Sequence, residues 1–218
     1  MFQKINKFSK LNDLVNIKYG LRTGNNKKYL FENDIGNTGI KIARGSSIER
    51  YYLNWKPEYL STIESLPPSY FTQELLKEKI IIQYVRTNST NIHSRWLDAC
   101  LIEEENFVPL NSTSFCYVKK DSSINLKYIL SILSSNLMNF YYKAHYTDVN
   151  VKPLYLSKLP IPKIDQKRQK PFIYIVDEVM KLKKQNQDTT ELEDQIDQMV
   201  YELYRLSEDE VALVEGKV

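Results

Sequence analysis

The sequence predicts an α+β fold, with a mixed-sheet body over residues 1–163 followed by a C-terminal helical hairpin over residues 164–218. In the body, short β-branched or aromatic runs alternate irregularly with helical patterns, whereas from residue 169 onward only the helical pattern remains. The two parts meet at Pro160 and Pro162, which favour an extended segment and exclude a helix. A chain of 218 residues is long enough for one domain with an appendage.

Three runs in the body predict strands. Residues 40–43, 80–85 and 115–118 are brief and rich in β-branched or aromatic side chains, as strands are. A helix is predicted over residues 125–145, because the apolar residues there recur at helical spacing and form one continuous stripe.

The hairpin is predicted from two apolar stripes, at residues 173–182 and 192–203. Capping boxes at Thr190 and Ser207, each with a glutamate three residues later, predict the starts of the second helix and of a third, short one. A hairpin with one apolar face is not stable alone. It must pack on the body, on a second copy or on another domain, and the pattern leaves all three open.

Charge is distributed unevenly. Residues 1–163 hold 22 Lys and Arg against 14 Asp and Glu, a balance of +8, while residues 164–218 hold 8 against 13, a balance of −5. A basic body favours a polyanionic partner, although a solvated basic face explains the charge equally well.

The compartment is predicted from what the sequence lacks. No apolar run has the length of a membrane span, and the N-terminus lacks the apolar core of a signal peptide. Cys100 and Cys116 lie in apolar or strand-like contexts and are interpreted as buried thiols rather than a disulfide. We therefore expect a cytoplasmic protein.

Three polar segments have the composition of DNA-contacting loops. The densest covers residues 18–29, and the others cover residues 43–52 and 83–91. Each combines Arg with hydroxyl or amide side chains, which can contact base edges and phosphates, and in the first two glycine allows close backbone approach. For the first segment, a hairpin turn with solvated polar residues remains the alternative.

Six motifs follow one another in a recognisable order. They are GLRTGNN at residues 20–26, ARGSSI at 43–48, IIIQYVRT at 80–87, YILSILSSNL at 128–137, LSKLPIP at 156–162 and IDQMVYELY at 196–204. In this order they resemble the C-terminal specificity (target-recognition) domain of TaqI-like adenine-N6 DNA methyltransferases, including those fused to a nuclease as single-chain type II restriction enzymes. The recognition domains of type I restriction specificity subunits are more distantly similar. Arg205 departs from the family, where glycine commonly ends the helix.

The resemblance implies that this chain reads double-stranded DNA. A separate methyltransferase catalytic domain, in cis or in trans, would bind S-adenosylmethionine and methylate a flipped adenine. No cofactor is expected in this chain, which is interpreted as a fragment of a longer enzyme. The alternative is a protein-interaction module or specificity subunit that docks a methyltransferase or restriction subunit through its C-terminal helices. Self-association through these helices is a further hypothesis.

No catalytic or metal site is predicted. The nearest match to the amino-methyltransferase motif, at residues 66–70, begins with Leu66, which cannot accept a hydrogen bond from the target amine. The acidic run at residues 103–105 is interpreted as a solvated loop, and His93 and His145 are too isolated to form a zinc pair. We therefore expect no enzymatic activity from the chain by itself.

The DNA-binding residues are assigned by side-chain chemistry. The residues predicted near base edges are Arg22, Asn25 and Arg44. The residues predicted to clamp phosphates are Lys27, Lys28, Arg50, Lys143 and Lys152. The further predicted contacts are Thr23, Asn26, Ser46, Arg86 and Thr87.

Overall fold

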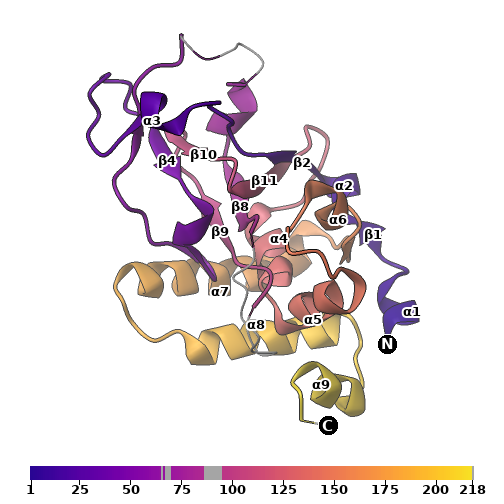
Figure 1. The fold of residues 1–218 in the computed structure, drawn as a ribbon. Helices are drawn as coiled ribbons and strands as arrows, with labels where there is room; N and C mark the ends of the chain where they lie inside the picture. The colour runs from indigo at the N-terminus through magenta and orange to yellow at the C-terminus, as the bar shows by residue number, and fades with distance from the viewer. Residues whose placement is uncertain (65, 67–69, 86–94, 218) are drawn as a thin grey trace.

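The central element is a four-stranded antiparallel sheet. The computed structural model describes residues 1–64, 66, 70–85 and 95–217. In this sheet the strand order is β2 (Val15–Tyr19), β11 (Thr113–Val118), β8 (Lys79–Gln83) and β9 (Ala99–Ile102). Figure 1 shows the sheet between a region of short strands and the helices.

A second four-stranded sheet covers one face of the first. Its order is β10 (Phe107–Pro109), β4 (Lys41–Ala43), β7 (Tyr59–Leu60) and β3 (Leu30–Phe31), and only the β10–β4 pair is parallel. Two small pairs complete the strands: β5 (Ile48–Glu49) with β6 (Tyr52–Leu53), and β1 (Ser9–Lys10) with β12 (Pro160–Ile161). The α+β class and the three predicted strands, at β4, β8 and β11, are confirmed.

The alternation of side chains along the central sheet divides the core into two clusters. Ile80, Ile82 and Cys116 point into a cluster shared with the helices. Ile81 and Cys100 point into a cluster shared with the second sheet. Both cysteines are buried and free, as predicted, and they lie on opposite faces of one sheet.

The predicted single helix at residues 125–145 is wrong in one respect: it is broken into α4 (Leu126–Leu133) and α5 (Asn136–His145). The Ser135 hydroxyl accepts a 3.1 Å hydrogen bond from the backbone N–H of Met138, so Ser135 caps α5. The apolar stripe continues across the break because residues of both helices pack in the same cluster. Periodicity alone therefore concealed the interruption.

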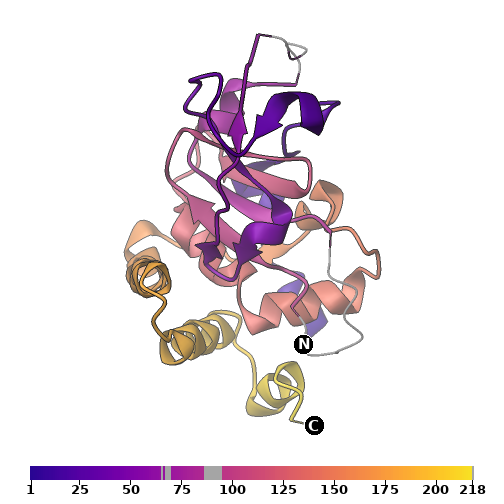
Figure 2. The same ribbon diagram turned by 60° about the vertical axis from the view of Figure 1, so that its left-hand side comes forward.

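The C-terminal helices pack on the body. They are α7 (Gln166–Lys184), α8 (Thr190–Leu203) and α9 (Glu208–Val214), and Figures 1 and 2 show α7 and α8 as a layer beneath the sheet. Val176, Val179, Ile196 and Val200 are fully buried in the cluster that also contains the body's helices. The division into domains at residue 163 stays a prediction, while the residues on its two sides share one apolar cluster.

Short helical turns connect these elements. They are α1 (Phe2–Ile5), α2 (Leu11–Leu14), α3 (Asn26–Tyr29), α6 (Pro153–Leu156) and the 3-10 turns η1 (Gly45–Ser47) and η2 (Gln73–Leu76).

Of the two capping boxes predicted for the C-terminal helices, one is observed at the predicted residue. The capping box at Ser207 is confirmed, because its side chain and that of Glu210 accept each other's backbone N–H. The box at Thr190 is wrong: the cap residue of α8 is Thr189, whose hydroxyl donates to Glu193 at 2.6 Å. The sequence offers two adjacent threonines, and only the fold selects between them.

The proline segment is extended, as predicted, and it is buried. Pro160 and Ile161 form β12, which pairs with β1. The hydroxyl of Tyr128 donates to the carbonyl oxygen of Pro162 at 2.6 Å. The segment is therefore held as a strand within the core.

Candidate nucleic-acid interface

The first polar segment, at residues 18–29, is hydrogen-bonded to the turn that joins β10 to β11. The backbone N–H of Leu21 donates to Pro109 O at 2.7 Å, and that of Gly20 donates to Thr113 O at 3.0 Å. A Cβ atom on Gly20 would lie 2.1 Å from Leu110 O, so this approach requires glycine.

The same turn holds the other two segments through Ser112. The Ser112 hydroxyl accepts the N–H of Gly45 at 2.9 Å, and its carbonyl oxygen accepts the N–H of Tyr84 at 3.0 Å. A Cβ atom on Gly45 would lie 2.2 Å from Ser112 O. Contacts from three segments that are far apart in sequence therefore meet at residues 109–113, through Gly20, Leu21, Gly45 and Tyr84. We call these residues, together with the adjoining residues 22–28 and 44–47, the reading face.

Within residues 20–28, some polar side chains build the loop and others project from it. Thr23 is buried and its hydroxyl donates to Asn26 Oδ1 at 2.5 Å, while Asn25 Oδ1 accepts the N–H of Lys28 at 3.2 Å and caps α3. Thr23 and Asn26 therefore shape the loop, and the cap occupies the side-chain oxygen of Asn25.

The projecting side chains of this loop are basic. Arg22, Lys27 and Lys28 are exposed. The Arg22 guanidinium carbon lies 5.6 Å from the ring centroid of Tyr19, and the Lys28 ammonium lies 5.0 Å from that of Tyr29. These aromatic contacts orient two of the three charges without neutralising them.

The second segment presents Arg44 and Ser46. Arg44 makes a bidentate pair with Glu58, in which Nε and Nη2 each donate to a carboxylate oxygen at 2.7 Å. The Arg44 side chain is still 41% exposed. Ser46, on η1, is exposed. The pair fixes the guanidinium plane and leaves its remaining donors at the surface.

Two predicted phosphate clamps lie elsewhere, and a third is neutralised by an ion pair. The Arg50 side chain, only 14% exposed, lies between carboxylates of α8. Lys152 lies near Tyr84, whose carbonyl oxygen accepts the N–H of Val151, but it is paired with Asp148. Lys143 is on α5, with its ammonium 5.7 Å from the ring centroid of Trp96. In Figure 1, α5 and α3 lie at opposite ends of the molecule. The two other predicted contacts, Arg86 and Thr87, lie outside the described residues.

Two tyrosines of the reading face were missed by the sequence assignment. Tyr19, at the end of β2, is 41% exposed and meets Tyr84 edge to face, with ring centroids 5.6 Å apart. Tyr19, Arg22 and Tyr70 also line a hollow of about 220 Å³. The available signal was that both tyrosines directly precede a polar loop, and that Tyr84 lies within the strand predicted at residues 80–85.

The segments considered above for metal binding, catalysis and membrane spanning lie only partly within the described residues. Over the described residues, no group of three or more His, Cys, Asp or Glu side chains could hold a metal ion. Glu103 is paired with Lys127 at 2.8 Å. Most of the motif match at residues 66–70, and His93, lie outside the described part of the chain. No helix in that part is long and apolar enough to span a membrane.

Comparison with known proteins identifies the family and a similar fold. Residues 40–161 match the family model of the TaqI-like C-terminal specificity domain. No curated protein matches the chain. Among solved structures, the type IIL restriction–modification enzyme MmeI, determined in complex with DNA, is similar with a TM-score of 0.66 and 12% identity over 94% of this chain and 34% of that chain. The S subunit of a type I restriction–modification system from M. genitalium has a TM-score of 0.45 and 10% identity, over 87% of this chain and 43% of its own.

The family match rests on more than half of the chain, and it includes β4, η1, β8, β11, α4 and α5. The chain spans about a third of the MmeI chain. By this match, the protein belongs to the family of TaqI-like C-terminal specificity domains, which serve DNA target recognition in restriction–modification.

Proposed function

We propose that this chain reads the sequence of double-stranded DNA for a restriction–modification adenine-N6 methyltransferase. The observation that carries the proposal is the meeting of Gly20, Leu21 and Gly45 at one turn, with three exposed cations, Arg22, Lys27 and Lys28, in the loop that follows Leu21. Exposed cations supply the sequence-independent attraction to phosphates, and a fixed arginine fork supplies selectivity for guanine.

The roles of the cations follow from how each is held. Lys27 and Lys28 follow the cap of a single helical turn and suit phosphates, which need charge more than exact geometry. Arg22 stands over Tyr19 and beside the hollow, where its fork can meet a base edge. Arg44 would contact DNA with the donors that Glu58 leaves free.

The methyl transfer itself is assigned to a catalytic domain in cis or in trans. That domain would bind S-adenosylmethionine, and this chain would only bind the duplex and select its sequence. The assignment is tested by incubating the chain with labelled S-adenosylmethionine and DNA. Methyl transfer by the isolated chain would refute it.

Docking of a partner subunit through the C-terminal helices stays the alternative. The apolar faces of α7 and α8 are covered by the body, so a partner would have to use their outer faces. Tyr174, which is 69% exposed, lies on such a face. Self-association on this face is a prediction that the mass of the chain in solution tests.

The experiment for the proposed function is selection from a random-sequence duplex library at several salt concentrations. We expect an enriched motif and an affinity that falls steeply with salt, with a log–log slope of about −0.9 per phosphate contacted. A steep slope without enrichment would leave only a sequence-independent grip. Absence of binding would overturn the proposal in favour of the docking alternative.

A further inference from the structure

A two-residue turn connects the reading face to the helices. Strands β5 and β6 form a hairpin in which Ile48 pairs with Leu53 and Glu49 with Tyr52, so Arg50 and Tyr51 form its tip. The base of the hairpin is η1, which carries Ser46 and is bound to Ser112 through Gly45. Each strand of the hairpin has only two residues. A change in the position of the tip therefore also changes the position of the base.

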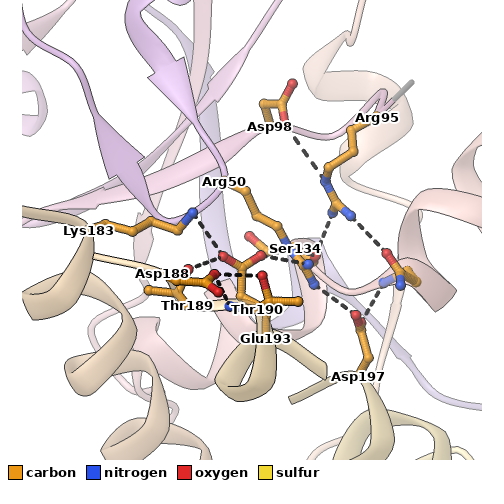
Figure 3. A network of polar contacts seen from close by, with 11 residues as sticks. Arg50, Arg95, Asp98, Ser134, Lys183, Asp188, Thr189, Thr190, Glu193 and Asp197 are labelled. Carbon is orange, nitrogen blue, oxygen red and sulfur yellow. Dashed lines mark hydrogen bonds and ion pairs between the residues drawn. The ribbon is translucent and has the colours of Figure 1, made fainter. Parts of the chain in front are cut away.

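The tip is held by several groups at once. Arg50 Nε donates to the carbonyl oxygen of Ser134, at the α4–α5 break, at 2.8 Å. Its two terminal nitrogens pair with carboxylates of α8, Glu193 at 2.7 Å and Asp197 at 3.0 Å. Figure 3 shows the guanidinium enclosed by these groups.

The partners of Arg50 are themselves fixed. Asp197 accepts the backbone N–H of Asn136 at 2.7 Å, which joins α8 to the start of α5. Glu193 also pairs with Lys183 of α7 at 2.8 Å. Arg95 donates to the same Ser134 carbonyl oxygen as Arg50, at 2.5 Å. The tip is thus tied to α4, α5, α7 and α8 together.

The ion pairs of Arg50 fix the orientation of the hairpin tip more than they stabilise the folded protein. The side chains of Arg50, Glu193 and Asp197 are 14%, 12% and 4% exposed, so their desolvation offsets much of their attraction. An apolar contact of similar volume would stabilise the tip as well but would not fix its direction. Charged groups with several directional partners hold a single geometry.

We propose that Arg50 is a positioning residue through which α8 sets the place of Arg44 and Ser46 on the reading face. It does not contact DNA. Arg50 fixes the tip of the hairpin. The side chains at the base of the hairpin are then held close to the positions that selective contact with DNA requires. The inference rests on the proposed function and assigns to the C-terminal helices a part in the choice of sequence.

The test compares Asp197→Asn with Val200→Ala. The first removes one charge from the group around Arg50; the second removes apolar volume one turn further along α8, where Val200 is fully buried, and leaves every polar contact in place. Both are expected to lower the melting temperature. Affinities for the motif selected by the wild type and for a scrambled duplex are measured below all melting temperatures.

We expect Asp197→Asn to lower the ratio of the two affinities on the order of five- to a hundredfold, as the loss of one base contact does, and Val200→Ala to leave it unchanged. Glu193→Gln, which removes the other charge beside Arg50, should behave like Asp197→Asn and replaces it if that variant does not fold. An unchanged ratio in the charge variants, or an equal fall in Val200→Ala, would overturn the inference alone. A wild type without any sequence preference would overturn the proposed function as well.

Discussion

The hydroxyl of Tyr204, just beyond the end of α8, donates a 2.6 Å hydrogen bond to the carbonyl oxygen of Pro160, and both residues are buried. Tyr204 also meets the ring of Phe8 edge to face, with centroids 5.1 Å apart. One side chain thus joins the C-terminal helices, the proline strand and the N-terminal segment.

Tyr204→Phe is therefore expected to lower the free energy of unfolding by about 1–3 kcal/mol, because a buried carbonyl oxygen loses a partner while the ring volume is kept. Urea unfolding measures the change. Tyr174→Phe is the matched control: Tyr174 is 69% exposed, and its loss should stay within about 0.5 kcal/mol. Equal effects of the two variants would contradict the role of the Tyr204 hydroxyl.

Arg22→Ala is expected to weaken binding to the selected DNA motif by about 1–3 kcal/mol and to leave binding to scrambled DNA nearly unchanged. Lys28→Ala should weaken both duplexes alike and reduce the salt slope by about 1. Lys184→Ala, which removes an exposed charge at the end of α7, is the control and should change neither. Equal losses on both duplexes for Arg22→Ala would exclude its contact with a base edge.

The buried Lys79 makes stability depend on pH. Burial lowers its pKa to about 8, against the attraction of Glu104, Glu105 and Glu78, and its ammonium donates to Phe107 O at 3.0 Å. Since the folded pKa lies below the unfolded value, the unfolded state binds the proton more tightly. Stability from this group therefore rises as pH increases from about 8 toward 10.5.

Lys79→Met should abolish this rise and stabilise the protein at pH 7. Because burial also raises the pKa values of Cys100 and Cys116, both proteins lose stability above about pH 9 through their thiols. The difference between variant and wild type, measured by urea unfolding from pH 7 to 9.5, isolates Lys79. A difference that does not shrink with pH would contradict the prediction.

Arg205 occupies a backbone conformation that favours glycine. Its φ is 56°, and the N–H of the next residue, Leu206, donates to Tyr201 O at 3.0 Å, which completes a helix-ending motif. Arg205→Gly is expected to raise the free energy of unfolding by about 1 kcal/mol. Asn186→Gly, at a φ of 53°, should gain less, because asparagine tolerates this region. A larger gain at Asn186 would argue against the backbone explanation.

Much of the local structure was predictable because it depends on local chemistry. Strand composition located β4, β8 and β11, and the two prolines predicted the extended segment that became β12. Helical periodicity located α4, α5, α7 and α8, but it could not show the break at Ser135, since the apolar stripe continues across it. The capping signal was correct at Ser207 and misplaced by one residue at Thr190.

The composition of the candidate site could be predicted from the sequence, but the arrangement of its residues in space could not. The segments around Arg22 and Arg44 were recognisable because glycine, arginine and amide residues concentrate there. Arg50 has the same local chemistry, yet its side chain is only 14% exposed and is paired with carboxylates more than 140 positions away along the chain. Tyr19 and Tyr84 join the reading face only because Ser112 and Thr113 bring their strands together.

The sequence by itself determined the α+β class, the buried thiols and the polar segments, because propensity, periodicity and composition act over a few residues. The family was recognisable by its resemblance, which rests on the order of several motifs. The tertiary structure alone decided which cations stay exposed, where α8 begins and how the hairpin tip is held. Ion pairs and close backbone approaches depend on partners that are distant in sequence, and only packing brings those partners within a few ångströms of one another.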